Sequence, residues 1–254
     1  MIWVLAILAG SLGAGCFLWY VVSFPRSQVF GPALVRGPIQ GKRIALTFDD
    51  GPSPFTARIL DILRERQVKA TFFVLGKNAE KHPEILRRMS AEGHTIGNHT
   101  YSHPYPFFFG RRHFAEEVDR TQEIIEKIAG FRPTIFRPPY GARWFGMFPA
   151  LQERGLRVVQ WSDSGYDWKG DPGLIAEEAL KNLKPGSIIL LHDALEGTRG
   201  FFAQLGRRLA GKPQLADSQT SPRADRSGTI DALPTIIEGA RLAGLDFVGI
   251  DEFL

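Results

Sequence analysis

The chain has 254 residues, 44% hydrophobic and 23% charged, which excludes a mostly disordered protein and suffices for one large domain or two small ones. Its net charge of +4 comes without a basic run, a zinc-finger spacing or an RNA-binding aromatic motif, so nucleic acid is not an expected partner. The single cysteine, Cys16, excludes an intramolecular disulfide and a cysteine-based zinc site.

The first predicted element is an apolar helix over residues 2–24, which contains no charged residue. This length is enough to cross a bilayer, which needs about 20 apolar residues, and no lysine or arginine precedes it as in a cleaved signal peptide. We therefore predict a transmembrane anchor, or an uncleaved signal, over residues 1–24. Arg26 and Arg36 follow it, and the positive-inside rule taken alone would keep the rest of the chain in the cytoplasm.

Residues 25–41 are rich in proline and glycine and are predicted to be a linker to a domain over residues 42–254. In that domain, short apolar runs alternate with helix-like patterns, which is typical of parallel strands with helices outside. The predicted strands are 43–48, 70–75, 95–97, 134–136, 157–161, 187–191 and 247–250. The predicted helices are 54–65, 83–92, 112–129, 148–154, 172–182 and 230–243. We expect an α/β fold, a complete or incomplete (β/α) barrel of about seven strands.

Two further features concern the connections. Four predicted helices are followed by a glycine that should form a left-handed cap, at Gly93, Gly130, Gly155 and Gly244. Residues 197–228 form an insertion that is longer than an ordinary connection and polar in its second half; it is interpreted either as a mobile insertion or as a lid that shapes the substrate site.

Polar side chains follow several predicted strands. Asp49 and Asp50 come after the first strand, and the Gly-Pro turn behind them supplies a bend that would let both carboxylates face one pocket. His99 and His103 follow the third strand four residues apart, which lets both imidazoles face one metal ion. Asp50 is the natural third ligand of a facial set with positions left open for water.

Three more polar residues belong to the same predicted edge, because Arg137, Asp167 and His192 each follow a strand. Taken singly, an adjacent Asp pair is more often a surface turn, an arginine a surface ion pair and a histidine a buried structural group. The carboxyl ends of barrel strands, however, gather at the face where barrel enzymes place their catalytic groups. Their shared placement therefore favours an active site.

The segments TFDDGP, HTYSHP, RPPY, DW and LLH occur in this order, and through them residues 42–254 resemble the polysaccharide deacetylase family, also called the NodB-homology or carbohydrate esterase family 4 domain. The resemblance implies a distorted (β/α) barrel and a metal-dependent hydrolase that removes N-acetyl groups from amino sugars. The expected substrate is a cell-envelope or extracellular polysaccharide: peptidoglycan, a chitin-like oligomer or an exopolysaccharide. Such a substrate would place the catalytic domain outside the cytoplasmic membrane.

The resemblance also implies a role for each candidate residue. The metal ligands would be Asp50, His99 and His103, and the ion Zn²⁺, with Co²⁺, Ni²⁺ or iron also suited to the set. The catalytic residues would be Asp49 as general base, Arg137 as its partner and His192 as general acid. Asp167 would hydrogen-bond His192 and raise its pKa, so that His192 carries a proton near neutral pH. The substrate-binding residues would be Pro138 and Tyr140 beside the sugar, Trp168 and Leu190 around the acetyl methyl, and the Tyr140 N–H at the oxyanion.

The chain departs from the family pattern at Ser164, where an aspartate is common, and in the insertion over 197–228; both bear on the substrate more than on the reaction. Phe107, Phe108 and Phe109 would either contact the exterior, by stacking on sugar rings or lying on a membrane surface, or fill the rim of the barrel. Two other functions stay open: a deacylase or deformylase of a lipid-linked amino sugar, and an inactive carbohydrate-binding domain. The intact set of polar residues argues against the second.

Overall fold

The structure is a computed structural model that describes residues 2–104, 110–194 and 225–254, without the side chains of residues 2–10, 12 and 14. Nine strands in this part of the chain form one sheet in the order β1-β6-β5-β4-β3-β2-β8-β7, with β9 paired to β2. The strands are β1 Ala33–Leu34, β2 Arg43–Asp49, β3 Thr71–Val74, β4 Thr95–Asn98, β5 Ile135–Phe136, β6 Arg157–Val159, β7 Asp163–Ser164, β8 Ile188–His192 and β9 Asp246–Val248. Every pairing is parallel.

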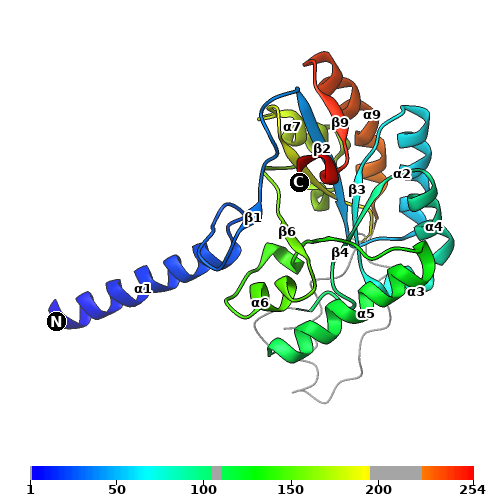
Figure 1. Cartoon of the computed structure of the whole chain (residues 1–254). Helices are drawn as coiled ribbons and strands as arrows, with labels where there is room; N and C mark the ends of the chain where they lie inside the picture. The colour runs from blue at the N-terminus through cyan, green and yellow to red at the C-terminus, as the bar shows by residue number, and fades with distance from the viewer. Residues whose placement is uncertain (1, 105–109, 195–224) are drawn as a thin grey trace.

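The sheet curls without closing, because its two end strands, β1 and β7, do not pair with each other within the described residues (Figure 1). The fold is therefore an incomplete α/β barrel, which refines the expected barrel of about seven strands. The helices are α1 Ile2–Ser23, α2 Pro54–Glu65, α3 Gly76–Lys81, α4 Pro83–Ala91, α5 Arg111–Ala129, α6 Met147–Gln152, α7 Pro172–Leu180 and α9 Ser227–Leu242. Short 3-10 turns are η2 Pro139–Gly141, η3 Asp167–Lys169 and η6 Ile250–Phe253.

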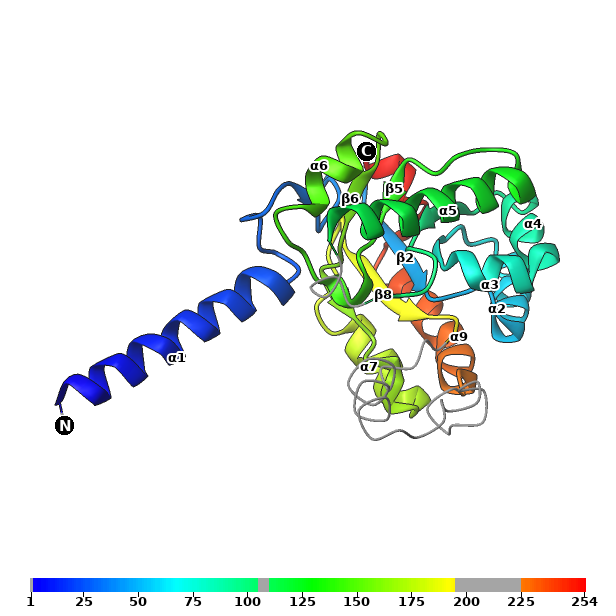
Figure 2. The same cartoon turned by 90° about the horizontal axis from the view of Figure 1, so that it is seen from below.

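The helices follow the strand order around the outside of the sheet. They pack in the sequence α6-α5-α4-α2-α9-α7, each against the next (Figure 2), while α1 projects away from the domain. Strand β2 lies in the middle of the sheet, and six of its seven residues are buried, because helices cover its outer face and side chains fill its inner face. This central strand carries the Asp pair at its end.

The start of α2 explains why a helix can begin so soon after β2 and the Asp pair. Ser53 caps the helix: its Oγ accepts a hydrogen bond from the Phe55 N–H at 3.1 Å, and its own N–H donates to Thr56 Oγ1 at 2.8 Å. Pro54 occupies the first helical position, where its missing N–H costs nothing. The capped start keeps the connection between β2 and α2 short and rigid.

Most predicted elements are confirmed within a few residues, and all four glycine caps have positive φ, between 66° and 83°. The sequence analysis missed β1, β7 and α3. Strand β1 corrects the interpretation of residues 25–41 as a linker only, because Ala33 and Leu34 pair with Val158 and Val159 of β6. A two-residue strand is too short to show a period, so only its pairing defines it.

Within the part of the chain described with backbone and side chains, no helix is long and apolar enough to cross a membrane. The anchor over residues 1–24 stays a prediction. The phenylalanines at 107–109 and most of the insertion predicted over 197–228 lie outside the described residues. The end of that insertion belongs to α9, which begins at Ser227, before the predicted start at residue 230.

Candidate active site

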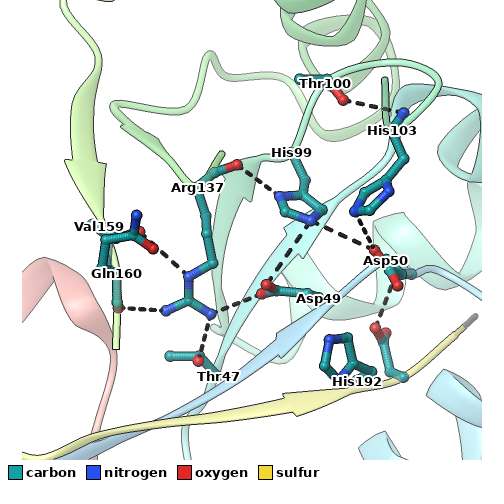
Figure 3. A network of polar contacts seen from close by, with 12 residues as sticks. Thr47, Asp49, Asp50, His99, Thr100, His103, Arg137, Val159, Gln160 and His192 are labelled. Atoms are coloured by element: carbon teal, nitrogen blue, oxygen red, sulfur yellow. Dashed lines mark hydrogen bonds and ion pairs between the residues drawn. The ribbon is translucent and has the colours of Figure 1, made fainter. Parts of the chain in front are cut away.

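The predicted polar residues meet at the carboxyl edge of the sheet, as Figure 3 shows for most of them. Asp49 is the last residue of β2 and lies beside His192, the last residue of β8. His99 follows β4, and Arg137 follows β5. Because carboxyl ends of neighbouring parallel strands share one edge, side chains far apart in sequence converge there. The prediction of a common rim is confirmed.

The two carboxylates of the Asp pair face different partners. Oδ1 of Asp49 lies 2.7 Å from Nη1 of Arg137. The backbone then turns: Asp50 has a φ of 79°, in the left-handed region, which aspartate adopts more readily than most residues. Oδ1 of Asp50 lies 3.4 Å from Nε2 of His103 and 3.5 Å from Nε2 of His99. The predicted bend therefore lets both carboxylates face one site, where Asp49 meets Arg137 and Asp50 meets the two histidines.

Asp50, His99 and His103 form a group that could hold a metal ion, since one ligand atom of each lies within 4.8 Å of the others. Nδ1 of His99 is 2.7 Å from the backbone oxygen of Arg137, and since a carbonyl only accepts, Nδ1 carries a hydrogen and Nε2, which faces Asp50, is the atom that could bind a metal ion. This orientation of His99 is the usual one in a metal ligand.

The charges of His103 and Asp50 also suit a divalent ion. Burial lowers the pKa of His103 to about 3, so its imidazole is neutral. Burial alone would raise the pKa of Asp50, but the imidazoles of His103, His99 and His192 hold it well below its usual value. Neutral imidazole and ionised carboxylate are the forms that bind metal, so the residues fit such an ion.

Arg137 is fully buried, and its guanidinium is held on several sides. Besides Asp49, it donates to Thr47 Oγ1 at 2.7 Å and to the backbone oxygen of Gln160 at 2.9 Å, and it lies 4.1 Å from the ring centre of Phe73. Burial lowers its pKa, while Asp49 acts in the opposite direction. The predicted Arg137–Asp49 pair is thus a buried pair with fixed geometry, which a surface ion pair is not.

His192, which is partly buried, and Asp167, which is fully buried, form a second pair, as predicted. Nδ1 of His192 lies 2.8 Å from Oδ1 of Asp167, and the His192 N–H donates to Oδ2 at 2.7 Å. Thr229 also donates to Oδ2, at 2.9 Å. Burial disfavours the charged imidazole, but the carboxylates of Asp167, Asp50 and Asp49 outweigh it and raise the pKa of His192 to about 9. His192 is therefore protonated at neutral pH.

The four residues predicted to bind substrate are distributed around these pairs. Tyr140 has a φ of 59°, and its ring meets the His103 ring edge-on with centroids 4.5 Å apart. Trp168 is half-exposed and lies beside His192, with centroids 6.0 Å apart. Pro138 and Leu190 are buried. Two aromatic rings thus border the site, one beside the candidate metal ligands and one beside His192.

Glu117 of α5 is a site-supporting residue that sequence reasoning missed. It is buried, and its carboxylate accepts the backbone N–H groups of Tyr101 and Ser102 at 3.0 and 2.7 Å and the Ser102 hydroxyl at 2.9 Å. The loop between His99 and His103 needs this support, because Thr100 and His103 both have positive φ. A glutamate in the middle of a helix gives no sequence signal for such a role.

Asp193 is the second residue missed. It is fully buried and accepts the Gly51 N–H at 2.9 Å and the Thr56 hydroxyl at 2.6 Å, which ties the turn after Asp50 to the end of β8. A Cβ on Gly51 would lie 2.1 Å from its Oδ2, so only glycine permits this approach. Burial raises the pKa of Asp193 to about 7. Its position next to His192 at a strand end was an available signal.

Known polysaccharide deacetylases are similar to this chain in sequence. A family model for polysaccharide deacetylases matches residues 36–159. A peptidoglycan-N-acetylglucosamine deacetylase of Bacillus cereus is 38% identical over 214 residues, 84% of this chain and 68% of that protein. A chitooligosaccharide deacetylase of Sinorhizobium fredii is 38% identical over 179 residues, 68% of this chain and 78% of that protein.

A solved structure has a similar fold. The crystal structure of the Bc1960 peptidoglycan N-acetylglucosamine deacetylase superposes with a TM-score of 0.72 at 37% identity and covers 87% of this chain and 91% of that one. The chain spans 35% and 32% of the length of two further deacetylases that it matches, which are therefore much longer proteins.

Proposed function

The chain belongs to the polysaccharide deacetylase family, a family of hydrolases, and we propose that it removes N-acetyl groups from the amino sugars of peptidoglycan. The observation that carries this proposal is the arrangement of Asp50, His99 and His103 between two charged pairs, Asp49–Arg137 and His192–Asp167. Amide hydrolysis needs an acid on one side of the scissile bond and a base on the other, and these pairs supply both.

Asp49 is the proposed general base. Its Oδ1 is held by Arg137, while its Oδ2 lies 3.9 Å from Nε2 of His99 and so faces the candidate metal site. Oδ2 would take a proton from the attacking water as the new C–O bond forms at the acetyl carbonyl. A divalent ion held by Asp50, His99 and His103 would polarise that carbonyl and acidify the water; zinc is the proposed ion, since it suits an Asp-His-His set.

His192 is the proposed general acid. Asp167 occupies Nδ1, so the proton that leaves is on Nε2. That proton would pass to the sugar nitrogen as the C–N bond breaks, and acetate and a free amine would result. The Tyr140 N–H is the proposed oxyanion donor, a group whose loss costs roughly 10²–10³ in kcat in other hydrolases. Trp168 and Leu190 are proposed to hold the acetyl methyl, and Pro138 and Tyr140 one side of the sugar.

We propose a location outside the cytoplasmic membrane, held by the apolar segment over residues 1–24. The support is the position of the proposed polymer, which lies outside the cell membrane, and the uncharged sequence of residues 2–24. A fusion of a reporter to the carboxyl end, with external protease added to intact cells, tests this. Protection of the reporter from the protease would contradict the proposed side.

Acetate release is the test of the activity. The metal-loaded full chain is incubated with peptidoglycan and, in parallel, with N-acetylglucosamine oligomers, and the variant Asp49→Asn serves as the blank. Release from peptidoglycan that the blank lacks is expected. Release of acetate from the oligomers alone would show that the substrate is a chitin-like oligomer and not peptidoglycan. Release from neither, with metal bound, would contradict the proposal and favour a lipid-linked amino sugar.

A further inference from the structure

The end of α1 and the residues directly after it are not a free tether but lie against the loop that carries Tyr140. The N–H of Arg143 donates to the backbone oxygen of Val22 at 3.1 Å. Val21 and Val22, at the end of α1, are buried in one apolar cluster with Ala142, and the partly buried Tyr140 and Phe30 pack on it. The contact therefore joins the end of the N-terminal helix to the loop after η2.

Arg143 makes this contact specific. Its side chain is almost fully buried, and its guanidinium donates to the backbone oxygens of Pro25 at 3.0 Å and Ser27 at 2.5 Å and also to that of Phe24. The last carbonyls of a helix and the turn after it are the negative end of the helix dipole, where a cation is favoured. A planar guanidinium reaches three carbonyls at once, which an ammonium does not do with the same geometry.

The loop held in this way leads directly to the site. Only Gly141 and Ala142 separate Arg143 from Tyr140, whose left-handed backbone must be kept in place by its surroundings. The Tyr140 ring in turn lies against His103. A displacement of residues 21–27 would therefore move Tyr140 before it moved any of the three candidate metal ligands.

We propose that residues 21–27 are part of the active-site structure, and that Arg143 is a positioning residue which holds Tyr140 through them. This inference rests on the proposed function, because it takes the Tyr140 N–H as the oxyanion donor. It gives the segment after α1 a role in catalysis that is separate from any role as a tether.

The test compares Arg143→Met with the matched control Arg154→Met, both in the full chain. Arg154 also makes three hydrogen bonds, to both carboxylate oxygens of Asp119 and to the backbone oxygen of Ala150, and it is not one of the site residues. Amide hydrogen exchange over residues 21–27 and 138–143, metal affinity from chelator competition, and kcat for acetate release are measured. Arg143→Lys serves as the conservative variant. If Arg143→Met does not fold, the exchange rates and kcat of Arg143→Lys are used for the decision instead.

For Arg143→Met we expect faster exchange in both segments and a fall in kcat of about tenfold or more, toward the roughly 10²-fold cost of losing an oxyanion donor. The metal affinity of Arg143→Met should stay within about twofold of that of the unaltered chain. The exchange rates and kcat of Arg143→Lys should lie between those of the unaltered chain and those of Arg143→Met. Arg154→Met should change neither exchange, nor metal affinity, nor kcat. Unchanged exchange at 138–143, or a loss of metal affinity as large as that of kcat, would overturn the inference. If the unaltered chain releases no acetate, the proposed function fails, while the exchange data still decide whether the two segments are coupled.

Discussion

At the residue scale, the candidate site contains two adjacent aspartates with different partners. Asp49 ends a strand and meets a buried arginine, whereas Asp50 turns into the left-handed region and meets two imidazoles. A strand alone would send neighbouring side chains to opposite faces, so the turn after β2 is what brings the proposed base and the candidate metal ligand into one site. The chemistry of the pair thus follows from one backbone dihedral.

His192 and Asp167 give a prediction about pH. An acid acts only below its pKa, so kcat/KM should fall as pH rises through the pKa of His192, which Asp167 raises to about 9. Asp167→Asn removes the carboxylate but leaves the burial, and the pKa should drop toward or below the ordinary value of about 6.5. The alkaline limb of the pH–rate profile should therefore move down by about two pH units or more.

The control for this prediction is Thr229→Val, which removes one hydrogen bond to Asp167 and keeps its charge. Its alkaline limb should move by less than about half a pH unit, because the charge of Asp167 dominates the shift. A bound divalent ion lowers the pKa of His192 in every variant, so the profiles are compared with the same metal loaded. An alkaline limb that stays in place in Asp167→Asn would exclude His192 as the acid.

At the element scale, both loops that carry candidate metal ligands are tied to neighbouring elements by buried carboxylates. Glu117 on α5 holds the loop after β4, and Asp193 after β8 holds the turn after β2. The loops contain strained residues at Asp50, Thr100 and His103, each with φ between 60° and 79°. Such conformations persist only where the surroundings enforce them. The ligand geometry is therefore set by helices and strands outside the site.

Glu117→Gln should weaken metal binding. A glutamine has the size of glutamate but no charge. Its amide oxygen can accept the two backbone N–H groups that Oε2 of Glu117 receives, but only as neutral, weaker hydrogen bonds, and its amide nitrogen cannot accept the Ser102 hydroxyl. Loss of supporting hydrogen bonds around a metal site typically lowers affinity by about 10–100-fold, and we expect a loss in that range. Chelator competition with zinc measures it.

Glu116→Gln is the matched control, because Glu116 is on the same helix but its only described partners, Arg112 and His113, are at the surface. It should leave the zinc affinity unchanged. Equal affinities of Glu117→Gln and the unaltered chain would show that the loop after β4 keeps its shape without the carboxylate.

At the scale of the whole molecule, long elements and strand-end residues could be predicted from the sequence, because each leaves a local pattern. The apolar run of β2 and the apolar face of α5 are such patterns, as are the Asp pair and the two histidines. Features set by distant partners could not be predicted. Strand β1 is defined by its pairing with β6, and Glu117 supports a loop 15 residues away. Arg143 has no local signal for its role, because the carbonyls that it binds belong to Phe24, Pro25 and Ser27, more than 100 residues away.

The open curl of the sheet likewise has no local signal. Closure would require β1 and β7 to pair, and each has only two residues. The end of the N-terminal helix packs against the loop after η2, so the contacts of the amino-terminal part are not limited to strand β1. The amino-terminal part of the described chain therefore contacts the loop that carries Tyr140, a contact that a division into anchor, linker and domain does not express.

The most direct measurement compares metal content and acetate release in Asp49→Asn and His103→Ala, purified and loaded with zinc in the same way as the unaltered chain. Asp49→Asn should retain the metal and lose at least about 10²-fold in turnover, since general-base catalysis contributes roughly 10²–10⁴-fold. His103→Ala should lose both the metal and the turnover. Equal loss of metal from the two variants, or full turnover in Asp49→Asn, would contradict the assignment of one aspartate to the proton and the other to the ion.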